Sequence, residues 1–131
     1  WLMFIASGLG PYSGQAVHFQ RAAPEKLPYA INRYRREAAR HYQVLNDQLA
    51  QTTYITGEQY TIVDMAAWGW IDKVLPVLGE GELDNFPHLL RWFKTVDTRP
   101  AVATARTISA GIEFKSEMDE TAKRALFPQN Y

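Results

Sequence analysis

Apolar side chains recur along residues 27–49 at the spacing of an α-helix. Intervals of three and four positions separate the members of this stripe, which are Leu27, Ile31, Tyr34, Ala38, Tyr42 (or His41), Leu45 and Leu49. Because an α-helix turns once every 3.6 residues, such positions share one face. The pattern therefore predicts a long amphipathic helix, with charged residues on its other face.

A second segment, from Ile62 to about Leu78, is apolar nearly all round. A helix without a polar face is buried, so we expect this one at the centre of the domain. Gly69 costs about 1 kcal/mol relative to alanine inside a helix, which favours tight packing on that side. Pro76 is expected to end or bend the helix.

The start of this apolar helix carries the spacing of a capping box. Thr61 at the N-cap is expected to accept from the backbone N–H of Asp64, while the Asp64 carboxylate accepts from the N–H of Thr61. Tyr60 and Met65 flank the box as a hydrophobic staple. We interpret Asp64 as structural rather than catalytic, and expect Asp64→Ala to cost about 1 kcal/mol and up to about 2.

Residues 1–21 are predicted to form a kinked helix, because Pro11 removes a backbone donor and its ring clashes with the preceding turn. Small residues around it, Gly8, Gly10 and Gly14, favour the close approach of another segment.

Two further helices are predicted to begin at Pro87 and Pro100, since proline suits the first helical turn. The apolar rhythm then fades, and residues 111–131 are predicted to be a tail. No segment alternates with period two over more than a few residues. The expected fold is all-α, a bundle of about five helices without a β-sheet.

Length and charge narrow the possible functions. The chain has 131 residues, enough for one domain with a sizeable core. Lys and Arg together number 14, and Asp and Glu together also number 14. The chain therefore has no strong positive electrostatic field that would attract nucleic acid or an anionic membrane. The apolar run at residues 1–6 is far shorter than the roughly 20 residues of a membrane span. Because the chain begins at Trp1 in mid-pattern, we expect it to be cut from a longer protein.

The absence of cysteine excludes a disulfide framework, a thiol nucleophile and a cysteine-based metal site, and it fits a cytoplasmic protein. The three histidines, His18, His41 and His88, are scattered, so no two of them lie four residues apart, and no carboxylate cluster accompanies them. No metal site is predicted.

Four segments, taken together and in order, resemble the all-α C-terminal domain of cytosolic glutathione transferases, and more narrowly the bacterial nu-class and yeast-prion-like branch. The segments are Gly8-Leu9-Gly10-Pro11 with Gly14-Gln15 and His18-Phe19, Ala23-Pro24 with Pro28-Tyr29-Ala30-Ile31-Asn32-Arg33-Tyr34, the capping box, and Arg99-Pro100-Ala101-Val102. The match covers about residues 1–110. It implies that the start of the first helix and an N-terminal thioredoxin-like domain are missing.

The resemblance implies that the whole protein catalyses glutathione-dependent disulfide reduction or conjugation, on a small disulfide or electrophile. The absent domain would hold most of the glutathione and the group that activates its sulfur, so no catalytic residue is expected here and the fragment alone should be inactive. A homodimer, with the first two helices in the interface, is also implied. The alternative is a non-catalytic interaction module, since one fold serves many functions.

Arg33 matches the family position that pairs with a glutathione carboxylate, and a guanidinium fork suits that role. The residues alone leave open an exposed ion pair with Glu37, worth about 0.3–0.5 kcal/mol. Tyr12 matches a position that lines the site, with a packed aromatic residue as the alternative. Phe19 is a further candidate for the wall of the second substrate, whereas His18 suits a satisfied core histidine better.

Overall fold

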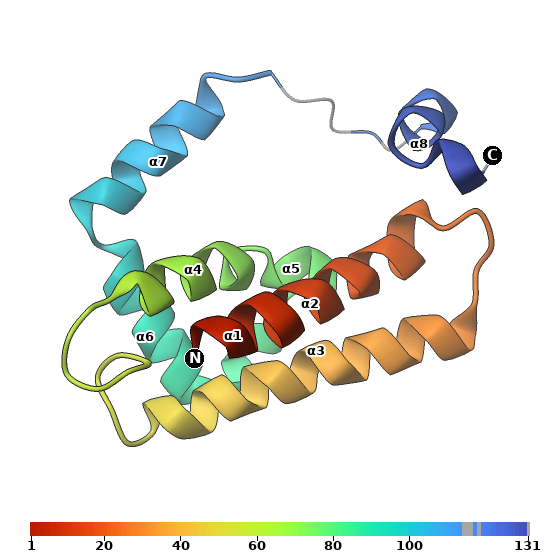
Figure 1. The fold of residues 1–131 in the computed structure, drawn as a ribbon. Coiled ribbons are helices and arrows are strands. Elements are labelled where there is room, and N and C mark those ends of the chain that lie inside the picture. Colours follow the sequence, from red (N-terminus) through yellow and green to blue (C-terminus); the bar gives the residue numbers. More distant parts are fainter. Residues whose placement is uncertain (114–116, 118, 131) are drawn as a thin grey trace.

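The computed structural model describes residues 1–113, 117 and 119–130, and the regular elements of this part are helices joined by loops (Figure 1). Its helices of eight residues or more are α2 (Gly10–Val17), α3 (Pro28–Leu49), α4 (Ile62–Ile71), α6 (Pro87–Asp97) and α7 (Pro100–Ala110). Shorter pieces are α1 (Leu2–Phe4), α5 (Val74–Val77), α8 (Glu120–Leu126) and short 3₁₀ turns at Glu82–Asn85 and Pro128–Asn130. Among the described residues there is no strand, so the predicted all-α bundle is confirmed.

The first helical run changes its winding where the sequence predicts a bend. Ile5–Leu9 is a π-helical turn, in which the Gly10 N–H donates to the Ile5 carbonyl, and α2 then begins at Gly10. Pro11 therefore lies in the first turn of α2, where a missing N–H costs least. A second π-helical turn, His18–Ala22, ends the run.

Figure 1 shows α1 and α2 lying antiparallel to α3. Glycines in this first helical run let aromatic rings of other helices lie close to its backbone. A Cβ added at Gly8 would overlap the His41 ring, and one added at Gly10 would lie 2.8 Å from the Trp70 ring. Gly14 has nothing within 4 Å of such an atom. The glycine prediction thus holds at the first two positions and is wrong at the third.

The hydrophobic core lies where α2, α3, α4 and α6 meet. Its largest fully buried side chains are Trp92, Tyr42, Leu9, Leu45, Leu49, Ile55, Ile71 and Leu89. Those from α3 belong to the apolar stripe that the sequence predicts. The helices therefore associate through the faces that their sequence patterns indicate.

Asp64, in the first turn of α4, is a fully buried polar centre of this core. The capping box is present: Asp64 Oδ2 accepts from the Thr61 N–H at 2.9 Å, and Thr61 Oγ1 accepts from the Val63 N–H at 3.2 Å. Asp64 Oδ1 accepts from the Trp92 indole at 2.8 Å and from the Ile55 N–H at 3.1 Å. One carboxylate therefore joins α4, the preceding loop and α6.

The start of α6 is capped by a residue far away in the sequence. Asn46 on α3 is buried, and its Oδ1 accepts from the N–H groups of His88 and Leu89 at 2.9 and 3.2 Å. Pro87 occupies the first helical position, as predicted. Helix α6 is thus fixed to α3 by its N-terminus as well as by apolar contacts.

The long apolar helix predicted from Ile62 to Leu78 is divided, which corrects the sequence expectation. Helix α4 ends at Ile71 and α5 begins at Val74. A proline ring clashes with the carbonyl four residues earlier, so Pro76 prevents the helix from continuing through Asp72.

Helix α4 is also less enclosed than the sequence suggests. Ile62 and Met65 remain 61% and 53% exposed, so the helix is buried on one side only. Gly69 has nothing within 4 Å of an added Cβ, so the tight packing predicted there is wrong.

The C-terminal part contains a short helix within the predicted tail. Asp119 caps α8 by accepting from the Ala122 N–H at 2.8 Å. Residues 114–116, 118 and 131 of the predicted tail lie outside the described residues. Within the described part, no helix is both long and apolar enough to cross a membrane.

Candidate functional site

An aromatic wall lies between the first helical run and α3. Tyr34 on α3 stacks on Phe19, with ring centroids 5.2 Å apart and planes 6° apart. The Tyr12 ring lies 6.3 Å from that of Tyr34 and 5.1 Å from that of His41. All four side chains are buried or half-buried. The structure thus joins the two predicted wall residues, Tyr12 and Phe19, through Tyr34.

Arg33 lies beside this wall on α3, and its side chain is 49% exposed. Its Nη1 atom is 2.7 Å from Oε1 of Glu37, one helical turn later. The hydrogen bond and the charge of Glu37 raise the pKa of Arg33, and Tyr12 and Tyr29 lie close enough to contribute in the same direction. Arg33 directly precedes Tyr34 of the wall on α3, and the ion pair with Glu37 that the sequence offers as the alternative is formed.

Phe19 also lines a cavity of about 360 Å³ at the end of the first helical run. The other lining residues are His18, Ala23, Pro24, Glu25 and Leu27. The His18 ring contacts the edge of Phe127, 4.9 Å away, from the segment after α8. Arg33 and Tyr12 do not line this cavity. Phe19 therefore contacts the aromatic wall through Tyr34 and also lines this cavity. His18 packs against the rings of Phe19 and Phe127.

Sequence reasoning did not assign a site role to Tyr34 or Glu37. Tyr34 belongs to the predicted apolar stripe, and a stripe position gives no sign that its ring meets both Tyr12 and Phe19. For Glu37, the sequence indicates only an exposed ion pair with Arg33. The sequence pattern that indicates contacts with both arginines is the position of Glu37 four residues after Arg33 and three residues before Arg40.

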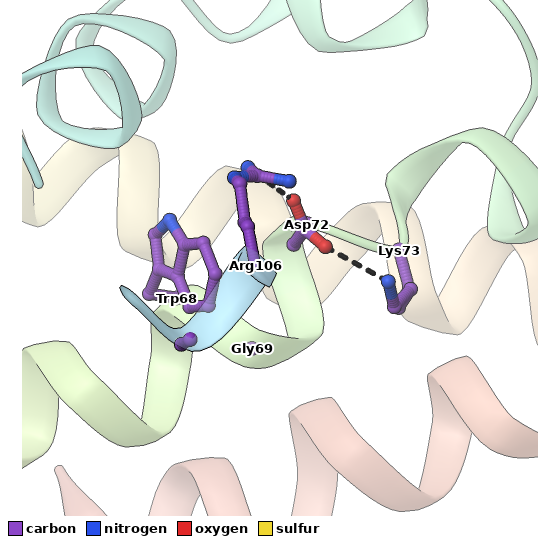
Figure 2. A pocket seen from close by; sticks show the side chains of 6 residues that line it. Trp68, Gly69, Asp72, Lys73 and Arg106 are labelled. Carbon is purple, nitrogen blue, oxygen red and sulfur yellow. Dashed lines mark hydrogen bonds and ion pairs between the residues drawn. The ribbon is translucent and has the colours of Figure 1, made fainter. Parts of the chain in front are cut away.

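A different cavity, of about 320 Å³, separates α4 from α7 (Figure 2). Trp68 and Gly69 form its α4 side, which explains why Gly69 meets open space. Arg106 from α7 reaches across it and pairs with Asp72 at 2.7 Å. A neighbouring cavity of about 240 Å³ shares Trp68 and contains both predicted staple residues, Tyr60 and Met65.

The charges around the Figure 2 cavity neutralise one another. Asp72 pairs with Lys73 at 2.8 Å and with Arg106, which also pairs with Asp97 at 2.6 Å. Burial raises the pKa of Asp72, but hydrogen bonds from Lys73 and Arg106 outweigh it and hold the pKa below its ordinary value. Asp72 therefore stays ionised, and through Arg106 it binds α7 to α4, while Asp97 binds the same arginine to the end of α6, which suits a structural role.

No group of three or more His, Cys, Asp or Glu side chains suited to a metal ion occurs among the described residues. The chemistry of the Arg33 region is instead that of an exposed cation beside aromatic rings, an arrangement that can bind an anionic ligand with an apolar part.

Comparison with known proteins identifies the family. The sequence profile of the glutathione S-transferase C-terminal domain matches residues 7–100. Among curated relatives, the chain is 39% identical over 105 residues to the disulfide-bond oxidoreductase YfcG and 42% identical over 118 residues to the disulfide-bond oxidoreductase YghU, both of Escherichia coli. The alignments cover 80% and 83% of this chain but 48% and 40% of those proteins. The chain thus spans half or less of their length.

Solved structures show the same fold with glutathione bound. The glutathione transferase URE2P6 of Phanerochaete chrysosporium, in complex with oxidized glutathione, has a TM-score of 0.80 and 36% identity, over 86% of this chain and 52% of that one. A glutathione transferase homolog of Lodderomyces elongisporus, with two GSH per subunit, has a TM-score of 0.76 and 35% identity, over 82% and 50% of the two chains. This chain belongs to the glutathione S-transferase family, as its C-terminal domain.

Proposed function

We propose that the whole protein catalyses glutathione-dependent disulfide reduction, or conjugation of glutathione to a small electrophile. Arg33 would bind a carboxylate of glutathione, and Tyr12 and Phe19 would form part of the wall for the second substrate. The chemical step would use a thiol-activating group outside this chain. The fragment alone is therefore expected to bind and orient, but not to turn over substrate.

The observation that carries this proposal is the position of Arg33 at the border of the aromatic wall. Glutathione ionises at its carboxylates, and a half-exposed guanidinium on the residue before Tyr34 offers such a group a charge-assisted hydrogen bond. The stacked rings of Phe19 and Tyr34 offer apolar surface to the second ligand. Disulfide reduction has support from the relatives YfcG and YghU, and glutathione binding from the solved neighbours.

The test is a steady-state assay of the full-length protein with glutathione and hydroxyethyl disulfide. Arg33→Ala removes a charge-assisted interaction of about 1.5–3 kcal/mol, so the KM for glutathione is expected to rise by roughly tenfold or more. Because the residue binds rather than reacts, kcat should change little.

Arg36→Ala is the matched control, since Arg36 is an exposed arginine on the same helix and pairs with no acidic side chain in the described part of the chain. It should leave the KM unchanged. An unchanged KM in Arg33→Ala would contradict the role of Arg33, and an absence of turnover in the full-length wild type would favour the non-catalytic module.

We also propose a cytoplasmic homodimer, with residues 1–110 as the helical domain and residues 111–131 as its C-terminal extension. Three exposed apolar side chains on the first helices support an interface there: Leu2, Met3 and Tyr29 are 41%, 74% and 83% exposed. A large contiguous patch of such side chains marks a surface that a partner covers. Light scattering of the full-length protein measures the mass, and a monomer at micromolar concentration would contradict this part of the proposal.

A further inference from the structure

Glu37 connects two arginines on the exposed side of α3. Its Oε1 is 2.7 Å from Arg33 Nη1, and its Oε2 is 3.1 Å from Arg40 Nη2 and accepts from Arg40 Nε at 3.1 Å. The Glu37 side chain is only 18% exposed, whereas those of Arg33 and Arg40 are 49% and 57% exposed. The carboxylate is thus the more enclosed member of the group.

The Glu37 side chain stems from a well-fixed part of α3. Its main-chain carbonyl is 2.7 Å from Nδ1 of His41, a buried residue that packs against Gly8 and the Tyr12 ring. Helix α3 is continuous on both sides of this position. A carboxylate that extends from such a rigid helix can hold a longer and more mobile side chain in place.

The ion pair leaves much of the Arg33 side chain open to solvent. The contact with Glu37 is made through Nη1, and the Arg33 side chain remains 49% exposed. A free arginine side chain loses several rotamers when it binds a ligand, which weakens binding. An arginine that is already fixed by Glu37 loses fewer.

The charge balance favours positioning over competition. Hydrogen bonds from Arg33 and Arg40 lower the pKa of Glu37, although burial opposes them, so the carboxylate is ionised at neutral pH. Two guanidinium groups share one carboxylate, so the group carries a net positive charge. An incoming carboxylate is therefore attracted to it rather than repelled.

We propose that Glu37 is a positioning residue, which holds the Arg33 guanidinium with one edge free for a carboxylate of glutathione. This inference rests on the proposed function of Arg33. It assigns to Glu37 a role in binding that an ordinary surface ion pair does not have.

The test uses the full-length protein with four forms: wild type, Glu37→Gln, Arg33→Ala and the double variant. Glu37→Gln keeps the side-chain shape and removes the charge. It is expected to raise the KM for glutathione by about two- to twelvefold, the range for immobilising one long side chain, with kcat within twofold of wild type. In the Arg33→Ala background the same change should have no further effect, because its target is gone. A purely structural role would lower thermal stability without this dependence on Arg33.

The outcomes separate the two proposals. If Arg33→Ala raises the KM but Glu37→Gln leaves it unchanged, Glu37 is a bystander and the function of Arg33 stands. If Glu37→Gln lowers the KM, the carboxylate competes with the ligand and the positioning role is wrong. If Arg33→Ala itself has no effect, the assignment of Arg33 fails and the inference fails with it.

Discussion

Replacing Asp64 with alanine tests whether one buried carboxylate joins three parts of this fold. The sequence treats Asp64 as an N-terminal cap of about 1 kcal/mol. In the structure it also accepts from the Trp92 indole and the Ile55 backbone, and its side chain is fully buried. The variant therefore leaves three enclosed donors without an acceptor, namely the N–H groups of Ile55, Thr61 and Trp92.

A buried donor without a partner costs about 1–3 kcal/mol, although neighbouring losses are not additive. We therefore expect Asp64→Ala to lower the free energy of unfolding by about 3–5 kcal/mol, well above the cost of a cap alone. Since domains of this size have about 5–15 kcal/mol in total, the variant should be near the limit of folding. Refolding should also be slower.

Urea unfolding followed by circular dichroism measures these changes. Thr61→Ala removes the cap hydroxyl and its weak 3.3 Å hydrogen bond to Asp64, but leaves the hydrogen bonds of Asp64 with Ile55 and Trp92, and should cost about 1 kcal/mol. Trp92→Phe removes the indole donor and also leaves a cavity where part of the buried ring was, so a double-mutant cycle with Asp64→Ala is needed to isolate the contact. Glutathione affinity of the folded fraction should not change. Equal costs for Asp64→Ala and Thr61→Ala would refute the buried-centre argument.

Two further predictions concern the contact between the first helical run and α3. Gly8→Ala places a Cβ into the His41 ring and should lower the free energy of unfolding by about 1–3 kcal/mol. Gly14→Ala has open space around it and should raise the free energy of unfolding by up to about 1 kcal/mol. Thermal unfolding measures both changes, and equal shifts in the two variants would contradict the reasoning. Burial raises the pKa of Tyr42 to about 12, and the Ser13 hydroxyl acts in the opposite direction. The neutral phenol therefore contributes full stability below pH 10, and about 3 kcal/mol is lost as the pH rises from 10 to 12. Urea unfolding across this range should show a smaller loss in Tyr42→Phe, and the same loss in both proteins would refute the assignment.

Several helix boundaries follow from short stretches of sequence. The starts at Pro87 and Pro100 appear as predicted, and the Thr61–Asp64 capping box is present. These signals involve residues within one turn of each other, so they do not depend on the rest of the fold. The apolar stripe of α3 is reliable for the same reason, because its period is local.

Other features depend on partners far away in the sequence. Asn46 caps α6 from α3, and Trp92 donates to Asp64 across 28 positions. The open surroundings of Gly69 arise because a cavity, rather than a packed helix, lies beside it. A single sequence gives the residue types but not which of them meet.

The sequence by itself determined the helical class, most helix starts and the family resemblance, because each is encoded by neighbouring residues. Only the tertiary structure placed Tyr12, Tyr34 and Phe19 in one wall. Those contacts depend on how α2 packs against α3, which the close approach at Gly8 decides. Packing between helices is cooperative and non-local, so no local pattern could have specified it.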